Sequence, residues 1–471
     1  MEIPNDILLL KDLVVKLLSR LDVLETENVA LKSENAELRS RLNLNSNNSH
    51  KPPSSDGLSK KPAFPQTSGK KSGGQPGHQG RTLTMVSTPD QIVVHHAPFC
   101  PCCSKIFTPS DVEQIGNKRQ VFDIPPPRIE VTEHQIGIIT CCNQQHKGIF
   151  PDLVNQPVQY GTKIKALSVL LNVDYKIPFE KIEQLLTDLY SCSFNESTAI
   201  SANLTCFDAL ASTEENIKTE ILKSESAHFD ETGMRVEGKL RWFHTASTGL
   251  FTYLFVHAHR GKKALQSVES LIKDFKNWAI HDCWASYFDF KDCSHALCNA
   301  HILRELEGLK ENGSIWVIEM KQLLIELFEL SQKATLIVPD KDIWVQKYQV
   351  ICQKADKEEP PPNYGKKGNR NGGRPKNSKG RNLLNRLIEH QNGILAFAFV
   401  QAIPFTNNQA ERDIRCLKTK QKVATSFRTF KGAQHYARIQ SFVSTLRKND
   451  MNVFQNLTNV FNQKPFSFGL G

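Results

Sequence analysis

The apolar positions of the first 44 residues follow a heptad repeat, which predicts a coiled coil. Leucine recurs at every seventh position from Leu10 to Leu38, and a second set of positions holds Val14 and Leu21, followed by two asparagines. These sets correspond to the d and a positions of a coiled coil, and the flanking charges pair across a parallel dimer. We therefore expect residues 1–44 to form a leucine zipper that makes the protein at least a dimer. An amphipathic helix packed on its own domain is the alternative.

Residues 45–90 lack the large apolar residues that a folded core needs. They are rich in Asn, Ser, Pro, Gly and Lys, so they cannot bury enough surface to fold alone, and we expect a disordered linker. The basic residues of this linker include Lys60, Lys61, Lys70, Lys71 and Arg81. It is either a solvated tether or a tether that also contacts DNA phosphates.

The segment 91–155 has the cysteine spacing of a β-rich, zinc-ribbon-like module. Strand-like runs at residues 120–124 and 129–139 separate a CxxC pair from a second cysteine pair. The candidate ligands of a structural Zn²⁺ are Cys100, Cys103, Cys141 and Cys142, with His146 or His134 as the alternative fourth ligand. Adjacent cysteines rarely both reach one tetrahedral ion, so the fourth ligand stays open. Reduced thiols without a metal are the alternative.

From residue 156 to 225 the apolar residues recur with helical spacing. The pattern predicts helices at 164–171 and 179–189 and a third helix that begins near Asn195. The second and third helices, joined by residues 190–194, have the arrangement of a helix-turn-helix that contacts DNA. A helix pair that only fills a core is the alternative.

Strand and helix patterns alternate over residues 226–311, which predicts an α/β domain. The predicted elements are a hairpin at 228–246, strands at 250–257, 278–282 and 295–298, and helices at 262–273, 299–310 and 407–422. Residues 312–403 are helical apart from a loop at 366–381. The pattern indicates a multi-domain α/β protein in which 226–311 and 404–450 form one domain with a helical insertion, before a tail at 451–471.

Three acidic residues far apart in the chain lie where a strand or a helix start would expose a carboxylate. Asp230 is on the first strand of the hairpin, and Asp282 ends a short apolar run that suits a buried strand whose carboxyl end opens into a site. Glu411 is near the start of a helix whose expected N-cap is Asn407. Carboxylate oxygens bind hard divalent cations, so these acids indicate metal-dependent phosphoryl transfer on a nucleic acid. Near-equivalent candidates on local sequence are Glu231, Glu305 and Asp413.

The basic residues are clustered, which favours a polyanionic partner. The net charge is +10, and the loop 366–381 contains seven basic residues and no acid. The candidate contacts to DNA are Lys366, Lys367, Arg370, Arg374, Lys376, Arg381, Arg412, Arg415 and Lys418. A solvated surface loop is the alternative for 366–381.

The overall composition is that of a soluble globular protein. A length of 471 residues exceeds a single core and predicts roughly two to four domains. The chain has no stretch of about eighteen apolar residues and no secretory signal at its N-terminus, so we expect a cytoplasmic protein without a membrane partner. Twelve cysteines in this length are too few for a disulfide scaffold.

Several long strings occur in order along almost the whole chain. They begin at Lys51 (KPPSSDG), Gly73 (GGQPGH), Pro157 (PVQYG), Asp230 (DETGMRVEGKLRW), His281 (HDCWASY), His295 (HALCNAHILREL), Gly373 (GRPK) and Pro404 (PFTNNQAERDIR). With these strings the sequence resembles the transposases of insertion sequence sixty-six, the TnpC type. Two departures are Thr406, where the family usually has Asp, and the adjacency of Cys141 and Cys142.

The resemblance implies an RNase H-like catalytic domain with a DDE triad at Asp230, Asp282 and Glu411, which would hold two Mg²⁺ or Mn²⁺ ions. It also implies leucine-zipper and zinc-binding parts before this domain. An insertion between the second and third acids is implied as well, here 312–403.

We therefore expect a bacterial transposase that acts on double-stranded DNA. It would bind the terminal inverted repeats of its element as a homo-oligomer, cleave the DNA and transfer the strands to target DNA. Whether accessory proteins of the same element take part stays open. The alternative is a non-catalytic, zinc-containing coiled-coil DNA-binding protein that regulates transposition, and a third candidate is a nuclease that only hydrolyses.

Overall fold

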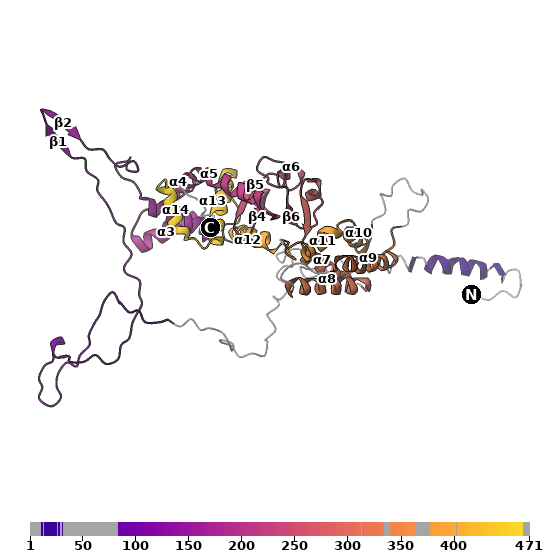
Figure 1. Ribbon diagram of the computed structural model, residues 1–471, viewed down its shortest axis with the longest axis horizontal. Coiled ribbons are helices and arrows are strands. Elements are labelled where there is room, and N and C mark those ends of the chain that lie inside the picture. The colour runs from indigo at the N-terminus through magenta and orange to yellow at the C-terminus, as the bar shows by residue number, and fades with distance from the viewer. Residues whose placement is uncertain are drawn as a thin grey trace. The chain divides into compact units, whose positions relative to one another are not determined.

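The computed structural model describes residues 83–311, 313–333, 340–362, 377–401 and 403–464, together with residues 11, 12, 14–25, 27, 28 and 31 (Figure 1). These residues belong to two compact units. The larger unit includes His134–Leu186 and the described residues from Ser193 onward, and the smaller includes residues 83–133 and Thr187–Cys192. Among the residues so described, no helix is both long and apolar enough to cross a membrane.

The larger unit is built on a five-stranded mixed sheet. Its strands are β3 (Ser226–Val236), β4 (Lys239–Ser247), β5 (Thr252–His257), β6 (Trp278–His281) and β7 (Ser294–Leu297). Their order is β5-β4-β3-β6-β7; β4 is antiparallel to both β3 and β5, whereas β6 is parallel to both β3 and β7. Glu237 and Gly238 connect β3 to β4 with positive φ angles of 53° and 72°, as a two-residue hairpin turn requires. The predicted hairpin and strands are confirmed.

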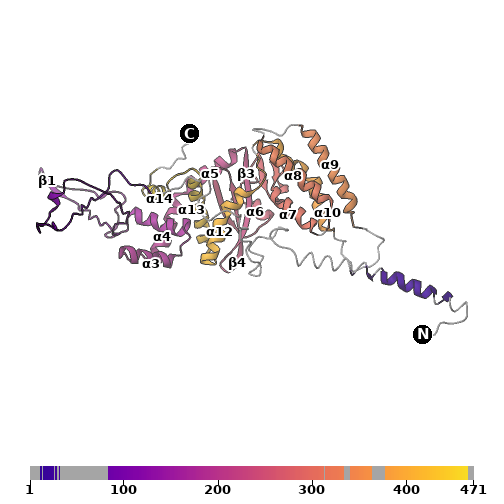
Figure 2. The same cartoon turned by 90° about the horizontal axis from the view of Figure 1, so that it is seen from below.

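Helices cover both faces of this sheet. They are α5 (Ala211–Lys223), α12 (Asn408–Ala424) and α13 (Phe430–Lys448). Side chains alternate between the two faces along a strand, so Val236 of β3 shares a core with α12 and α13, whereas Phe229 shares the opposite core with α5. Figure 2 shows α12 alongside the strands. Asp230 has the same parity as Val236 and therefore faces α12.

A further group of helices packs against β6 and β7. These helices are α7 (Asn299–Lys310), α8 (Trp316–Lys333), α9 (Lys341–Glu358), α10 (Lys379–Glu389) and α11 (Gln391–Phe399). Ile280 of β6 and Leu297 of β7 are buried in one core with residues from all five helices. The described part of 312–403 is therefore largely helical, as the sequence predicts.

The region before the sheet contains the predicted helices. They are α2 (Thr162–Val169), the π-helical turn η3 (Leu170–Asp174), α3 (Phe179–Tyr190) and α4 (Glu196–Ala209). Asn195 caps α4, because its Oδ1 accepts a hydrogen bond from the Thr198 N–H (3.0 Å). The segment predicted as a C-terminal tail instead contains α14 (Val453–Phe461), since Leu457 and Phe461 bury an apolar face in the core that includes α2.

The helix predicted at 262–273 is wrong beyond its first turn. Only α6 (Lys262–Leu265) is helical. Ser267, Ser270 and Asp274 then hydrogen-bond to carbonyls three residues earlier, which forms a series of tight turns. These turns still bury Leu271 and Ile272 in the core that includes the sheet, whereas Val268 is exposed, so the spacing that suggested a helix partly reflects packing against the sheet.

Residues 120–124, predicted as a strand, form none. Val121 and Ile124 are 90% and 85% exposed, so no described residues cover their apolar side chains. The strands of the predicted β-rich module are β1 (Ile138–Cys141) and β2 (Gln144–Lys147), which form an antiparallel hairpin in the larger unit. The described residues of the smaller unit include a bridge between Phe99 and Ile106 and the 3₁₀ turn η2 (Pro109–Asp111).

Candidate active site

The register of β3 and β6 brings two of the three predicted acids to one level of the sheet. In this parallel pair His228 lies opposite Ile280, so Asp230 and Asp282, two positions further along, are level with each other. Neighbouring strands are about 4.8 Å apart. Asp282 is held just beyond β6, because its Oδ1 accepts a hydrogen bond from the Trp284 N–H (3.1 Å). The two carboxylates are therefore neighbours.

Asn407 fixes the third acid beside this pair. It occupies the N-cap position of α12, as predicted, but its side chain does not cap the helix. Its Oδ1 accepts a hydrogen bond from His228 Nδ1 (2.8 Å), and its Nδ2 donates one to the Phe229 carbonyl (2.8 Å). Burial lowers the pKa of His228 to about 4, so the imidazole is neutral. The first turn of α12, which contains Glu411, is thereby tied to the strand that carries Asp230.

The pKa of the Asp230 carboxyl reflects the nearby charges of the other two acids. Burial raises the pKa of the Asp230 carboxyl well above its ordinary value of 3.8, and nearby negative charges raise it further. These charges belong to Glu231, Asp282 and Glu411. Glu411 also has an Oε1 that is buried and accepts no hydrogen bond from the described residues. Such a group of mutually repelling carboxylates is favourable only when a cation or protons compensate it.

The carboxylates of the three near-equivalent acids bind other side chains of the protein. Glu231 points to the opposite face of β3, where its carboxylate binds Arg260 (2.7 Å) and the Tyr287 hydroxyl (2.7 Å). Asp413 binds Lys448 (2.7 Å). Glu305 forms an ion pair with Arg386. The local sequence does not distinguish these acids from Glu411, whereas the surroundings of their side chains do.

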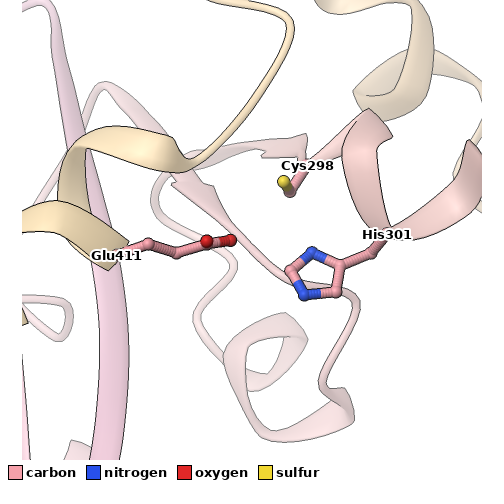
Figure 3. Close-up of side chains that lie close together, drawn as sticks. All are labelled: Cys298, His301 and Glu411. Atoms are coloured by element: carbon pink, nitrogen blue, oxygen red, sulfur yellow. The ribbon is translucent and has the colours of Figure 1, made fainter. Parts of the chain in front are cut away.

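Two side chains that the sequence analysis did not single out lie next to Glu411. Cys298 and His301 offer a sulfur and a ring nitrogen that lie with a Glu411 carboxylate oxygen within 4.8 Å of one another (Figure 3). Cys298 is the residue between β7 and α7, and His301 is in the first turn of α7. The signal that would have found them is the C-x-x-H spacing at a strand-to-helix junction.

The structure separates the predicted DNA contacts into three groups. Arg412, Arg415 and Lys418 lie on α12 and are exposed. Arg381 was predicted to lie in the basic loop, and this placement is wrong. It is in α10, and its guanidinium forms an ion pair with Asp356. The predicted contacts outside the described residues are Lys366, Lys367, Arg370, Arg374 and Lys376.

Cys100 and Cys103, the first predicted zinc pair, lie in a tight turn. The Cys100 N–H donates to the Lys105 carbonyl (2.8 Å), and the Ser104 N–H donates to the Cys100 carbonyl (2.9 Å). Hydrogen bonds from the backbone of Cys103 and Cys102 lower the pKa of the Cys100 thiol. A turn whose N–H groups point at a sulfur favours the thiolate, which is the form that binds a metal.

The second predicted zinc pair lies at the turn of the β1–β2 hairpin. Cys142 and Asn143 connect the strands with positive φ angles of 52° and 59°. The sulfurs of Cys141 and Cys142 are 3.6 Å apart, and His146 is on β2. The two pairs belong to different units, and the zinc site stays a prediction.

The comparisons with known proteins identify the family of the chain. The model of the Transposase IS66 family matches residues 157–435, a span that contains all three predicted acids together with Cys298 and His301. The chain belongs to this family. The resemblance found from the sequence strings is therefore confirmed. A family of unknown function, DUF6444, matches residues 8–84. No curated protein matches the chain.

Proposed function

We propose that this member of the IS66 family cleaves and joins DNA strands with Asp230, Asp282 and Glu411 as its catalytic acids. The observation that carries the proposal is the effect of Asp282 and Glu411 on Asp230, because it requires three remote segments to bring their carboxylates together. The other acids that local sequence allowed have protein partners.

The strand order supports an RNase H-like assignment for the sheet. Three antiparallel strands continue into two strands parallel to the first, in the order β5-β4-β3-β6-β7. The first acid lies in the middle of β3 and the second just after β6. In this arrangement the acids meet at one place on the sheet, and α12 adds the third.

The donor set fits hard divalent cations. All three side chains offer oxygen, which Mg²⁺ and Mn²⁺ prefer, and one oxygen of Glu411 has no hydrogen-bond partner among the described residues. Two such ions, when bound, would activate the attacking oxygen and stabilise the leaving oxygen of a phosphodiester.

The reaction would have two chemical steps, and in both the side chains of the protein would bind and orient the DNA. In the first, a water oxygen attacks a phosphodiester at the element end and releases a 3′-hydroxyl. In the second, this hydroxyl attacks a phosphodiester of the target, so one P–O bond forms as another breaks. The exposed Arg412, Arg415 and Lys418 beside Glu411 would contact the phosphates, and the basic residues of 366–376 would add further contacts.

The front part of the chain would serve binding and assembly. We propose that residues 1–44 pair as a parallel coiled coil, and that α3 and α4 contact the terminal inverted repeats as a helix-turn-helix. A structural Zn²⁺ would be held by Cys100, Cys103 and Cys141 with Cys142 or His146. The protein would act on DNA in the bacterial cytoplasm.

The test is strand cleavage and joining by the full-length protein on DNA carrying the ends of its element. Asp230→Asn, Asp282→Asn and Glu411→Gln should each lower joining at least about a thousandfold with Mg²⁺ while end binding is retained, because the amide keeps the shape and loses the charge. Asp274→Asn, an exposed acid in the same domain, is the matched control and should join like the wild type. Full activity in any one of the three variants would remove that residue from the triad.

The same assay separates the alternatives. A non-catalytic regulator would bind the ends without metal-dependent nicks. A nuclease of this fold would nick without joined products. The convergence of the three acids favours an enzyme over the regulator, since a regulator has no need to bury mutually repelling carboxylates.

A further inference from the structure

Cys298, His301 and Glu411 form a cluster with a chemistry different from that of the three acids. Their sulfur, nitrogen and oxygen ligand atoms lie within 4.8 Å of one another. Figure 3 shows the three side chains pointing toward one another from α12, from the start of α7 and from the end of β7. A thiol and an imidazole add nothing to a site for Mg²⁺, which prefers oxygen, and they are the ligands that Zn²⁺ and similar ions select.

The Cys298 sulfur is buried beside Glu411 and has one hydrogen-bond donor fixed on it. Its Sγ accepts a hydrogen bond from the Asn407 N–H (3.1 Å), which orients the sulfur at the junction of β7 and α7. Burial, with the nearby charge of Glu411, raises the pKa of the Cys298 thiol to about 11, although backbone N–H groups lower it in part. The free thiol is therefore protonated, and a bound cation is what would favour its thiolate.

The other ligands are placed to complete the set. His301 follows Cys298 by three residues, so a single helical turn presents both to the same point. Glu411 enters from α12 with an Oε1 that is buried and accepts no hydrogen bond in the described part of the chain. Ligand atoms around tetrahedral Zn²⁺ are roughly 3.3–3.6 Å apart, so torsions of the Glu411 side chain are enough to close the set.

We propose that Cys298, His301 and Glu411 bind one thiophilic divalent cation of the Zn²⁺ class. On binding, the Cys298 S–H bond breaks, an S–metal bond forms, and the proton goes to solvent, so no electron transfer is involved. Three protein ligands leave a fourth position for water or for a phosphate oxygen. Because Glu411 is shared with the proposed Mg²⁺ site, the ion would compete with Mg²⁺ for this carboxylate and so inhibit catalysis. This inhibition rests on the proposed function, whereas the binding itself does not.

The test is Co²⁺ binding by the full-length protein without DNA. Co²⁺ takes the place of Zn²⁺ and gives a sulfur-to-metal charge-transfer absorption when a thiolate binds it. Because the other cysteines also bind Co²⁺ if the predicted zinc module is real, the readout is the difference between wild type and Cys298→Ser. A serine at this N-cap position still accepts the Asn407 N–H, so the fold should be retained.

The expected result is one bound Co²⁺ per chain fewer in Cys298→Ser, with a matching loss of charge-transfer absorption. His301→Gln should weaken the same binding event at least about tenfold. Cys352→Ala, a buried cysteine in α9, should bind Co²⁺ like the wild type. Equal stoichiometry and equal absorption in Cys298→Ser and wild type would overturn the proposal. The outcome is independent of the joining assay, because neither DNA nor Mg²⁺ is present.

If both proposals hold, Zn²⁺ should inhibit joining by the wild type in the presence of Mg²⁺. Cys298→Ser should lower the sensitivity of joining to Zn²⁺ at least about tenfold, because the variant lacks the sulfur ligand. Unchanged inhibition of the variant would mean that Zn²⁺ acts elsewhere, and would contradict the overlap through Glu411.

Discussion

Glu411 and Asp413 lie two residues apart on α12, yet their surroundings give them different roles. The Asp413 carboxylate binds Lys448 (2.7 Å) and Gln409 (3.0 Å), whereas Oε1 of Glu411 is buried without a partner in the described residues. Local sequence made the two acids near-equivalent. Lys448 approaches Asp413 from another helix, so the folded structure separates the two acids where local sequence does not. Before the fold was known, the position of Glu411 near a helix start suggested it, and the family resemblance strengthened that choice.

Lys420 is a buried cation whose charge costs stability. It lies on α12 with its Nζ 3.3 Å from the Asn172 carbonyl and 5.7 Å from the centre of the Tyr436 ring. Lys176 lies 5.5 Å from the same ring centre. Burial, with repulsion by Lys176, lowers the pKa of Lys420 to about 8 from 10.5. The unfolded state therefore binds more protons between pH 8 and pH 10.5, and stability should rise with pH across this window.

We predict that Lys420→Met raises the free energy of unfolding at pH 7 by on the order of 1–3 kcal/mol. The gain should shrink as the pH rises from 8 to 10.5, because the folded wild type then has a neutral amine and the unfolded state progressively loses its proton as well. Urea denaturation at pH 7 and pH 10.5 measures this, with Lys422→Met, an exposed lysine of the same helix, as the control. A gain that is the same at both pH values would contradict the assigned cause.

At the scale of elements, α11 depends on a close approach to β7. A methyl group added at Gly393 would lie 2.6 Å from the His295 carbonyl oxygen, which belongs to the backbone of β7 and cannot rotate away. The packing of the insertion helices on the sheet therefore requires glycine at this position.

We predict that Gly393→Ala lowers the free energy of unfolding by about 1–3 kcal/mol, because α11 must move away from the sheet. Thermal unfolding of the full-length protein measures the effect. Gly249→Ala, where an added methyl meets nothing within 4 Å, is the control and should leave the melting temperature unchanged. Equal melting temperatures for the two variants would show that α11 can shift at little cost.

Most elements could be predicted where the apolar pattern was strong and bounded by turn or cap residues. The hairpin β3–β4, the short strand β6 and the helix α7 are examples. The pattern failed at 262–273, where tight turns bury apolar residues at helix-like spacing, and at 120–124, where the apolar residues stay exposed. Both errors arise because periodicity records which residues are apolar and not what covers them.

At the scale of the whole molecule, the described leucines of the predicted zipper are exposed. Leu17, Leu24 and Leu31 lie in helical backbone and are 56%, 56% and 58% exposed. Leu10 and Leu38, the ends of the repeat, lie outside the described residues. A recurrent exposed leucine is the side chain that pairing with a second chain would bury.

We predict that Leu17→Glu combined with Leu24→Glu lowers the sedimentation-equilibrium mass of the full-length protein to that of one chain, since a buried carboxylate at each d position disfavours pairing. Val15→Glu changes a residue of the same helix outside the a and d positions, and should leave the mass unchanged. A single-chain mass for the wild type would contradict the predicted leucine zipper.

The convergence of the acids is the part of the site that periodicity could not supply. The sequence placed Asp230, Asp282 and Glu411 on separate elements, and the family strings named them together. Their proximity follows from the β3–β6 register and from the bridge that Asn407 makes to β3. Neither feature is visible without the fold, and the same holds for the approach of Cys298 and His301.

The most direct test of the account is strand joining by Asp230→Cys with two different ions. A thiolate is a poor ligand for Mg²⁺ and a better one for the softer Mn²⁺. The account predicts that the variant joins no detectable DNA with Mg²⁺ and regains measurable joining with Mn²⁺, whereas Asp274→Cys joins normally with either ion. Wild-type joining by Asp230→Cys with Mg²⁺ would contradict the claim that this carboxylate holds the catalytic metal.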